Sequence, residues 1–325
     1  MTLHFGIYPG GILGDDQGIV RPVRPDLPDR ITEALDALQG DSPTLLVRAY
    51  HPFAATVAPL EPPTPADPQT YLQRGRKLDL VLPFREPSGA LDGWLEFVRE
   101  AVRTRGPQLA SVQICEEPNA DLPVLDGSTP NVLNALVQGV IAAKQEARAL
   151  GHSLAVGFNA VPTFDPADTF WSELGALADA RFRQSLDYVG LDFFPDVFRP
   201  IPGEQLAEAV TAVLAGFRRT DLRKADIPDS VAIRICENGW PTGPGRSEQR
   251  QATTLETVVR TVAALAPDLN IDGYSFFALR DADSTAEGLF HRFGLLRDDY
   301  TPKPAFETYR RLISDLGNPP VIPAR

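Results

Sequence analysis

The chain has 325 residues, of which 43% are hydrophobic and 23% charged, and it contains 25 Gly and 31 Pro. This composition is typical of a folded globular protein and excludes a collagen-like or disordered chain. The formal net charge is −12, and the basic residues form no cluster. We therefore expect neither a nucleic acid nor an anionic membrane surface as a partner.

The cysteine content and the apolar runs bear on the compartment. Cys115 and Cys236 are too few for a disulfide framework, which favours a reducing compartment. The opening residues MTLHFGIYPGG lack the basic and apolar regions of a secretory signal. No apolar run approaches the roughly 20 residues of a membrane span. We expect a soluble, cytoplasmic protein, and the sequence leaves its oligomeric state open.

Short, nearly continuous apolar runs recur along the chain, and an amphipathic stretch follows each of them. Such runs are typical of strands that are buried on both faces of a parallel sheet. Eight runs fit this pattern, at 3–8, 44–50, 78–84, 110–116, 153–159, 187–194, 231–237 and 272–279.

The segments between these runs carry helical periodicity with recognisable ends. Segment 130–150 has Pro130 near its first turn and Gly151 just beyond its end, which are the positions that these residues favour. The second crossover differs, because 52–69 holds six prolines and leaves room only for a short helix near 68–76. Helices are predicted at 27–39, 89–105, 130–150, 204–218, 247–265 and 302–316, with a poorly bounded one near 167–180.

Eight strand–helix units without a composition break or a Gly/Ser linker predict an α/β fold, a single (β/α)8 TIM barrel that spans residues 1–325 as one domain. An open doubly wound sheet shows the same alternation and is the rival arrangement. In a (β/α)8 barrel the active site lies at the C-terminal ends of the strands. The residues that close each run are therefore the candidates for chemistry.

Two of the runs end in carboxylates. The fourth run closes with CEEPN (115–119), and the seventh closes with CENGW (236–240). Carboxylates at the ends of strands four and seven face each other across the mouth of such a barrel. Glycoside hydrolysis requires two carboxylates of this kind, one that protonates the leaving oxygen and one that attacks the anomeric carbon.

These motifs resemble those of clan A glycoside hydrolases. EPN (117–119) is similar to the Asn-Glu-Pro motif that carries the acid/base on strand four, and ENGW (237–240) is similar to the nucleophile motif on strand seven. The ending FGLLRDDYTPKPAFETYRRLI (293–313) resembles the tail of the family after strand eight. The three motifs follow the order of the family over most of the chain. The resemblance implies a barrel with Glu237 as nucleophile and Glu117 as acid/base.

The chain also departs from the family pattern. Glu116 replaces the Asn that binds the sugar 2-hydroxyl, so Glu116 is either a substrate contact or a partner of an arginine. The strand-six motif DFFP (192–195) lacks the His and the Tyr of the family, and that Tyr would hydrogen-bond to the nucleophile. Phe277 or Phe276 stands where strand eight usually ends in Trp, whereas Arg48 matches the basic residue beside the nucleophile.

Several roles have two interpretations at this stage. Glu116 and Glu117 compete to be the acid/base, because strict strand alternation turns only one of them toward the mouth; the adjoining Pro118 favours Glu117. Trp240 stacks on a sugar or packs in the core, and the residues that end strands one and two line the pocket or cap their loops. The candidate substrate-binding residues are Arg48, Glu116, Asn119, Trp240, Phe277, Tyr8 and His51.

The sequence thus predicts a retaining β-glycoside hydrolase that acts on an oligosaccharide or glycoside by double displacement, with a carbohydrate as its partner. No His pair of a zinc site and no glycine-rich nucleotide loop occurs, so we expect neither a metal nor a cofactor. A catalytically silent barrel that binds carbohydrate is the alternative. A lyase or aldolase is disfavoured, because none of the four lysines ends a predicted strand.

Overall fold

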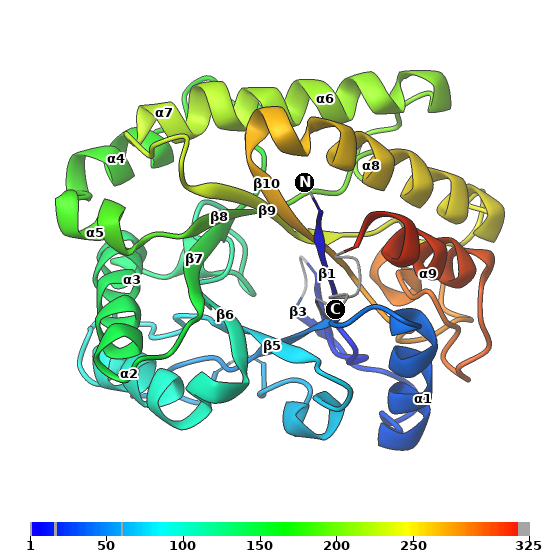
Figure 1. Cartoon of the computed structure of the whole chain (residues 1–325), viewed down its shortest axis with the longest axis horizontal. Helices are drawn as coiled ribbons and strands as arrows, with labels where there is room; N and C mark the ends of the chain where they lie inside the picture. The colour runs from blue at the N-terminus through cyan, green and yellow to red at the C-terminus, as the bar shows by residue number, and fades with distance from the viewer. Residues whose placement is uncertain (1, 16–17, 60, 318–325) are drawn as a thin grey trace, which may run out of the picture.

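Each predicted apolar run forms a strand of one closed sheet. The structure is a computed structural model that describes residues 2–15, 18–59 and 61–317. In these ranges the strands are parallel and follow the order β1-β10-β9-β8-β7-β6-β5-β4, and β1 pairs with both β10 and β4. The predicted (β/α)8 barrel is confirmed, and the open sheet is excluded because the ring has no edge (Figure 1). The strands are β1 (His4–Ile7), β4 (Leu46–Tyr50), β5 (Lys77–Leu82), β6 (Leu109–Ile114), β7 (Ala155–Ala160), β8 (Tyr188–Asp192), β9 (Ala232–Asn238) and β10 (Ile271–Phe276).

Helices surround the ring of strands and bury their apolar faces against it (Figure 1). The predicted helices are present, but two of their ends differ. One begins at Trp94 rather than 89, because Gly89 and Gly93 adopt positive φ angles of 68° and 80° that interrupt a helix. Another continues to Leu269 with Pro267 inside it. The helices are α1 (Pro28–Gln39), α2 (Trp94–Arg105), α3 (Val132–Ala149), α4 (Phe170–Leu177), α5 (Ala180–Ser185), α6 (Leu206–Gly216), α7 (Leu222–Lys224), α8 (Glu248–Leu269) and α9 (Pro304–Leu316).

The two crossovers with weak helical patterns are irregular in the structure. The proline-rich second crossover holds a 3-10 turn at Pro68–Tyr71, in agreement with the limited room that the prolines leave. The fifth crossover is divided between α4 and α5, which are separated by Ala178 and Asp179. The Asp179 side chain accepts a hydrogen bond from the Phe182 amide at 3.0 Å and so caps α5.

A short hairpin was not predicted from the sequence. It consists of β2 (Leu13–Asp15) and β3 (Gly18–Val20), which pair antiparallel in the loop after β1. Strands of three residues are too short to show the alternation that identifies a strand in a sequence. The hairpin matters for the site, because Leu13 reaches the wall of the cavity described below.

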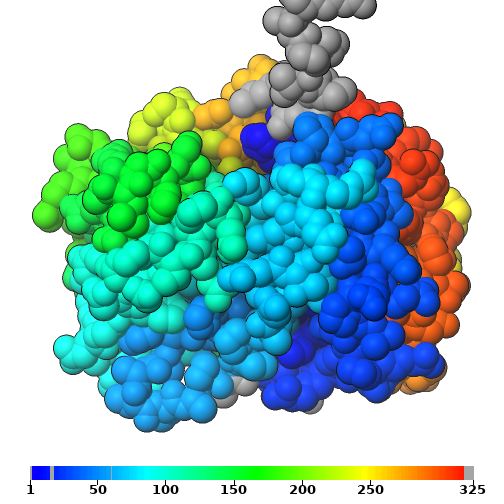
Figure 2. All heavy atoms as spheres, turned by 60° about the horizontal axis from the view of Figure 1, so that its bottom comes forward, coloured from blue at the N-terminus to red at the C-terminus, as the bar shows by residue number. Residues whose placement is uncertain are grey.

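The first and last helices close the outer layer. The Leu3 amide donates to the Leu316 carbonyl at 3.2 Å, and α1 packs against α9. In Figure 2 the blue N-terminal segment accordingly adjoins the red segment of α9. No helix within the described ranges is long and apolar enough to cross a membrane. A cytoplasmic location and the extent of one domain over 1–325 stay predictions.

Candidate active site

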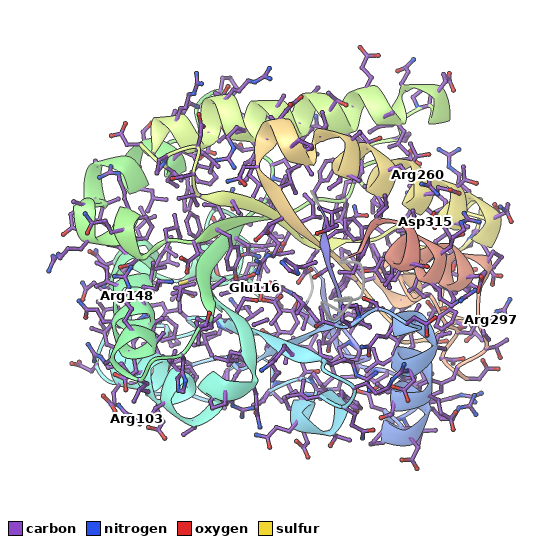
Figure 3. The ribbon with its side chains drawn as sticks, in the orientation of Figure 1. Arg103, Glu116, Arg148, Arg260, Arg297 and Asp315 are labelled. Carbon is purple, nitrogen blue, oxygen red and sulfur yellow. The ribbon has the colours of Figure 1, made fainter. Side chains whose placement is uncertain are left out.

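Four carboxylates meet in a cavity of about 1040 Å³ at the C-terminal ends of the strands. Glu116 and Glu117 follow β6, Asp192 ends β8, and Glu237 lies near the end of β9. Figure 3 shows Glu116 near the middle of the ring, whereas the labelled arginines lie on the outer helices and loops. Strands far apart in the sequence therefore bring the two predicted catalytic glutamates to one site.

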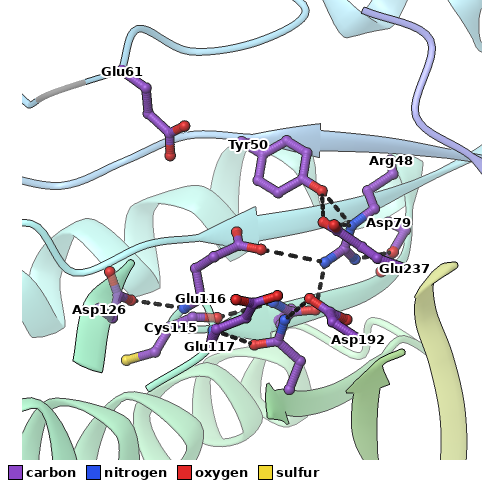
Figure 4. A network of polar contacts seen from close by, with 12 residues as sticks. Arg48, Tyr50, Glu61, Asp79, Cys115, Glu116, Glu117, Asp126, Asp192 and Glu237 are labelled. Carbon is purple, nitrogen blue, oxygen red and sulfur yellow. Dashed lines mark hydrogen bonds and ion pairs between the residues drawn. The ribbon is translucent and has the colours of Figure 1, made fainter. Parts of the chain in front are cut away.

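Glu237 is held by two side chains of β4. The Tyr50 hydroxyl donates a short hydrogen bond to Glu237 Oε1, and Arg48 Nε lies 3.4 Å from the same oxygen (Figure 4). Both side chains point into the barrel because residues two apart on a strand share a face. Arg48 is fully buried, and so its charge is compensated within the site.

Arg48 is itself fixed by side chains of the next two strands along the ring, β5 and β6. Its Nη1 donates to Asp79 Oδ2 of β5 at 2.7 Å, and its Nη2 donates to Gln113 Oε1 of β6 at 2.9 Å. The second Asp79 oxygen accepts a bond from the Ser111 hydroxyl at 2.6 Å. This buried network leaves the guanidinium one orientation, with one edge directed at Glu237.

The chain after β6 is kinked so that both adjacent glutamates enter the cavity. Cys115 and Glu117 have positive φ angles of 65° and 44°, which interrupt the alternation of an extended strand. The Glu116 amide donates to Asp126 Oδ2 at 2.7 Å, and the Glu117 amide donates to Asn159 Oδ1 at 2.8 Å. The prediction that only one of the two glutamates faces the mouth is wrong for this reason, since both line the cavity.

The carboxylates crowd together in the floor of the cavity. One oxygen each from Glu116, Asp192 and Glu237 lie within 4.8 Å of one another, and Glu117 contacts Asp192. Glu116 Oε2 and Asp192 Oδ1 are buried without a hydrogen-bond partner among the described residues. These two oxygens are therefore free to accept or share hydrogens from a bound molecule.

Burial and repulsion between the carboxylates shift the pKa values of the site, and the shift differs between Glu117 and Glu237. Burial, followed by the charges of Glu237 and Glu116, raises the pKa of Glu117 to about 8. Burial also raises the pKa of Glu237, but Arg48 and the Tyr50 hydrogen bond oppose that rise. Burial and the Glu237 charge raise the pKa of Asp192 well above its usual range. The arrangement favours a proton on Glu117 and a charge on Glu237.

The cluster of Glu116, Asp192 and Glu237 offers oxygen ligands of the kind that hard cations prefer. Arg48, however, lies 3.4 Å from Glu237 and 3.9 Å from Glu116. Its positive charge compensates these carboxylates and would repel a divalent cation bound between them. The site is better suited to a neutral molecule with hydroxyl groups than to a metal ion.

Phe277 lines the cavity, and the Tyr8 ring stacks against Phe277. The two rings stack with centroids 5.5 Å apart, and the Tyr8 ring meets Tyr50 edge-on at 5.3 Å. The Tyr8 hydroxyl is hydrogen-bonded to Thr64 Oγ1 at 2.6 Å and donates to the Ile12 carbonyl at 2.8 Å. Tyr8 thus positions two cavity residues without lining the cavity itself.

The other predicted binding residues hold the surrounding loops. Asn119 is paired with both backbone groups of Val161 at 2.9 Å, which ties the loop after β6 to the loop after β7. Trp240 is buried and donates through Nε1 to Asp196 Oδ2 at 3.0 Å. His51 packs its ring edge-on against another aromatic ring, that of α2, at 5.0 Å. None of these three lies among the residues that line the cavity.

Sequence reasoning did not find Tyr50, Asp192 and Asn159 as site residues. Tyr50 makes a hydrogen bond to Glu237, as the resemblance expects of a tyrosine on strand six, and its position two residues after Arg48 was a usable signal. Asp192 was noted only as a departure from the family motif.

Both cysteines are buried and free, as expected of packed thiols.

Comparison with known proteins supports the fold. No protein-family profile and no curated protein matches the sequence. A β-glucuronidase from Ruminococcus gnavus is similar in structure, with a TM-score of 0.61 and 14% identity over 96% of this chain and 50% of that chain. A family 39 glycoside hydrolase from the gut symbiont Bacteroides cellulosilyticus WH2 has a TM-score of 0.61 and 18% identity, over 94% of this chain and 66% of that chain.

The chain shares its barrel with glycoside hydrolases. It spans about half the length of the glucuronidase, so the barrel is the part that the two have in common. At 13–18% identity the likeness establishes the fold. The chemistry has to be argued from the residues of this chain.

The raised pKa of Glu117 predicts a pH-dependent stability change in Glu117→Gln. The folded protein keeps this proton up to about pH 8, whereas an unfolded glutamate releases it near 4.5. Folding stability is therefore lost as the pH rises between these values, and glutamine removes that loss. We expect the stability of Glu117→Gln relative to wild type to rise from pH 4.5 to pH 8, by on the order of 1 kcal/mol of unfolding free energy per pH unit. The melting temperature of the variant should rise relative to wild type over the same range.

Differential scanning calorimetry of both proteins at several pH values measures this difference. Glu33→Gln on the exposed face of α1 is the matched control, and its difference from wild type should stay constant. A Glu117→Gln difference that is equally constant would contradict a proton held by Glu117.

Proposed function

We propose that the protein is a retaining β-glycoside hydrolase with Glu237 as nucleophile and Glu117 as general acid/base. The observation that carries this proposal is the pairing of a carboxylate braced by Arg48 and Tyr50 with a second carboxylate whose pKa is raised to about 8. Retaining glycosidases need this division between a charged and a protonated carboxylate. The shared barrel supports the same class of reaction.

The first step forms a bond between Glu237 and the anomeric carbon while the glycosidic bond breaks. Tyr50 and Arg48 hold Glu237 Oε1, which leaves the other oxygen to attack. Glu117 gives its proton to the departing oxygen, so that the leaving group departs as a neutral alcohol. Glu117 then deprotonates water, which attacks the anomeric carbon, releases Glu237 and returns the proton to Glu117.

The unpartnered oxygens of the floor supply contacts to the sugar. Glu116 Oε2 and Asp192 Oδ1 are buried, and both residues line the cavity beside Glu237. Sugar hydroxyl groups both donate and accept hydrogen bonds, so they satisfy carboxylates in either protonation state. Glu116 thereby takes the position of the Asn that contacts the 2-hydroxyl in the resemblance.

The leaving group separates the roles of the two glutamates. A panel of aryl β-glycosides first identifies the sugar. Dinitrophenolate departs without a proton, so Glu117→Ala should retain the first step on that substrate and lose about 10²–10⁴-fold on an alkyl glycoside. Glu237→Ala should lose nearly all activity on both substrates, because it lacks the attacking group.

Pre-steady-state and steady-state rates on the two substrates measure this contrast, with Glu33→Ala as an unaffected surface control. Full activity in Glu237→Ala would overturn the proposal. Binding of sugars with no turnover of any glycoside would favour the catalytically silent barrel instead.

Tyr50→Phe tests the brace on the nucleophile. The Tyr50 hydrogen bond lowers the pKa of Glu237, so its loss should raise that pKa and move the acidic limb of the kcat/KM profile to higher pH. We expect kcat/KM at the optimum to fall about 10–100-fold, since a hydrogen bond to a charged group contributes about 1.5–3 kcal/mol. An acidic limb unchanged from wild type would show that Tyr50 does not act on Glu237.

A further inference from the structure

Above the carboxylates, the cavity is walled by phenylalanine rings. Five of them form a continuous surface, which we name the phenylalanine wall: Phe194, Phe198, Phe277, Phe290 and Phe293. Phe277 meets Phe194 at 6.3 Å between centroids, Phe194 meets Phe198 at 6.3 Å, and Phe198 meets Phe290 at 6.2 Å. The wall therefore connects the inside of the cavity to its mouth.

The inner end of the wall lies beside the nucleophile. The Phe277 amide donates to the carbonyl of Asn238, the residue after Glu237, at 2.8 Å. The outer end is open to solvent, since Phe198 is 62% exposed. Two further apolar side chains of the cavity are exposed, namely Phe164 at 65% and Leu122 at 41%. Large apolar groups left open around one cavity mark a binding surface.

Apart from the four carboxylates, most polar side chains that line the cavity are engaged within the protein, although Arg85 Nε has no hydrogen-bond partner among the described residues. Glu61 pairs with Arg85 at 3.2 Å, and Thr64 is hydrogen-bonded to Tyr8 at 2.6 Å. Asp196 binds Arg250 at 2.7 Å and Trp240 at 3.0 Å.

Arg199 lies over the ring of Phe164 at 5.3 Å, a contact that does not use the N–H groups of its guanidinium. A second sugar ring on this wall would lose water from its hydroxyl groups and find few partners, which is unfavourable.

We propose that the leaving group of the natural substrate is a bulky apolar alcohol, which lies along the phenylalanine wall while the sugar occupies the carboxylate floor. This inference rests on the proposed function and specifies its substrate class. A cavity of about 1040 Å³ accommodates a sugar together with such a group. The acidic floor also disfavours an anionic leaving group, because like charges repel.

The chain length of an alkyl leaving group tests the proposal. Methyl, butyl, hexyl and octyl β-glycosides of one sugar have leaving alcohols of similar acidity, so differences in kcat/KM report contact with the wall. We expect kcat/KM to rise with each added methylene, up to about fourfold per group. The octyl glycoside should also exceed a disaccharide of the same sugar.

Phe198→Ala should reduce the ratio of octyl to methyl kcat/KM, because it removes the exposed end of the wall. Leu150→Ala, at an exposed apolar residue beyond the end of α3, is the matched control and should keep the ratio of wild type. Circular dichroism verifies that both variants are folded. A ratio that Phe198→Ala leaves unchanged would overturn the placement of the leaving group on the wall.

Calorimetry with 1-octanol gives a readout that does not depend on turnover, and burial on the wall predicts binding with a negative heat-capacity change. Hydrolysis with a kcat/KM that does not change with alkyl chain length, or that is higher for the disaccharide, would overturn this inference and keep the proposed function. Octanol binding without hydrolysis of any glycoside would overturn the proposed function and support the apolar site. If no glycoside is hydrolysed and 1-octanol does not bind, both the proposed function and this inference are overturned.

Discussion

The contact of Arg48 and Tyr50 with Glu237 is the interaction on which the rest of the site depends. It places one cation and one hydroxyl donor against a single oxygen in a buried floor that holds four carboxylates. Without these partners, burial and repulsion would favour protonation of Glu237, the proposed nucleophile. The strands around Arg48 serve this contact, because Asp79 and Gln113 fix the guanidinium from β5 and β6.

The burial and crowding that oppose a charge on Glu237 also favour a proton on Glu117. Glu117 has no arginine of its own within the described network, and burial, followed by the charges of Glu237 and Glu116, raises its pKa to about 8. The kink at Cys115 and Glu117 is what brings the second carboxylate into the floor. The cavity thus has a floor of carboxylates and a wall of phenylalanine rings, which we propose receive the sugar and the leaving group respectively.

The sequence predicted the barrel and the strand ends well, because eight buried strands impose long apolar runs and two of them end in recognisable carboxylate motifs. Tyr50 was missed because its contact with Glu237 crosses the barrel between residues far apart in the chain. Alternation along β4 places Tyr50 on the same face as Arg48 but does not show what that face contacts. The kink at Cys115 and Glu117 was missed because neither cysteine nor glutamate favours a positive φ, so the sequence carries no signal for it. The phenylalanine wall is assembled from separate loops, whose residues follow no period.

The central claim is that Glu237 forms the covalent bond to the sugar while Glu117 moves the proton. Peptide mass mapping tests it most directly, after Glu117→Ala is mixed with a dinitrophenyl glycoside of the preferred sugar and quenched in acid. The account predicts the added mass of one sugar on the peptide that contains Glu237, and on no other peptide. An adduct on Glu116 or Asp192, or an active wild type whose Glu117→Ala variant never accumulates an adduct, would contradict it.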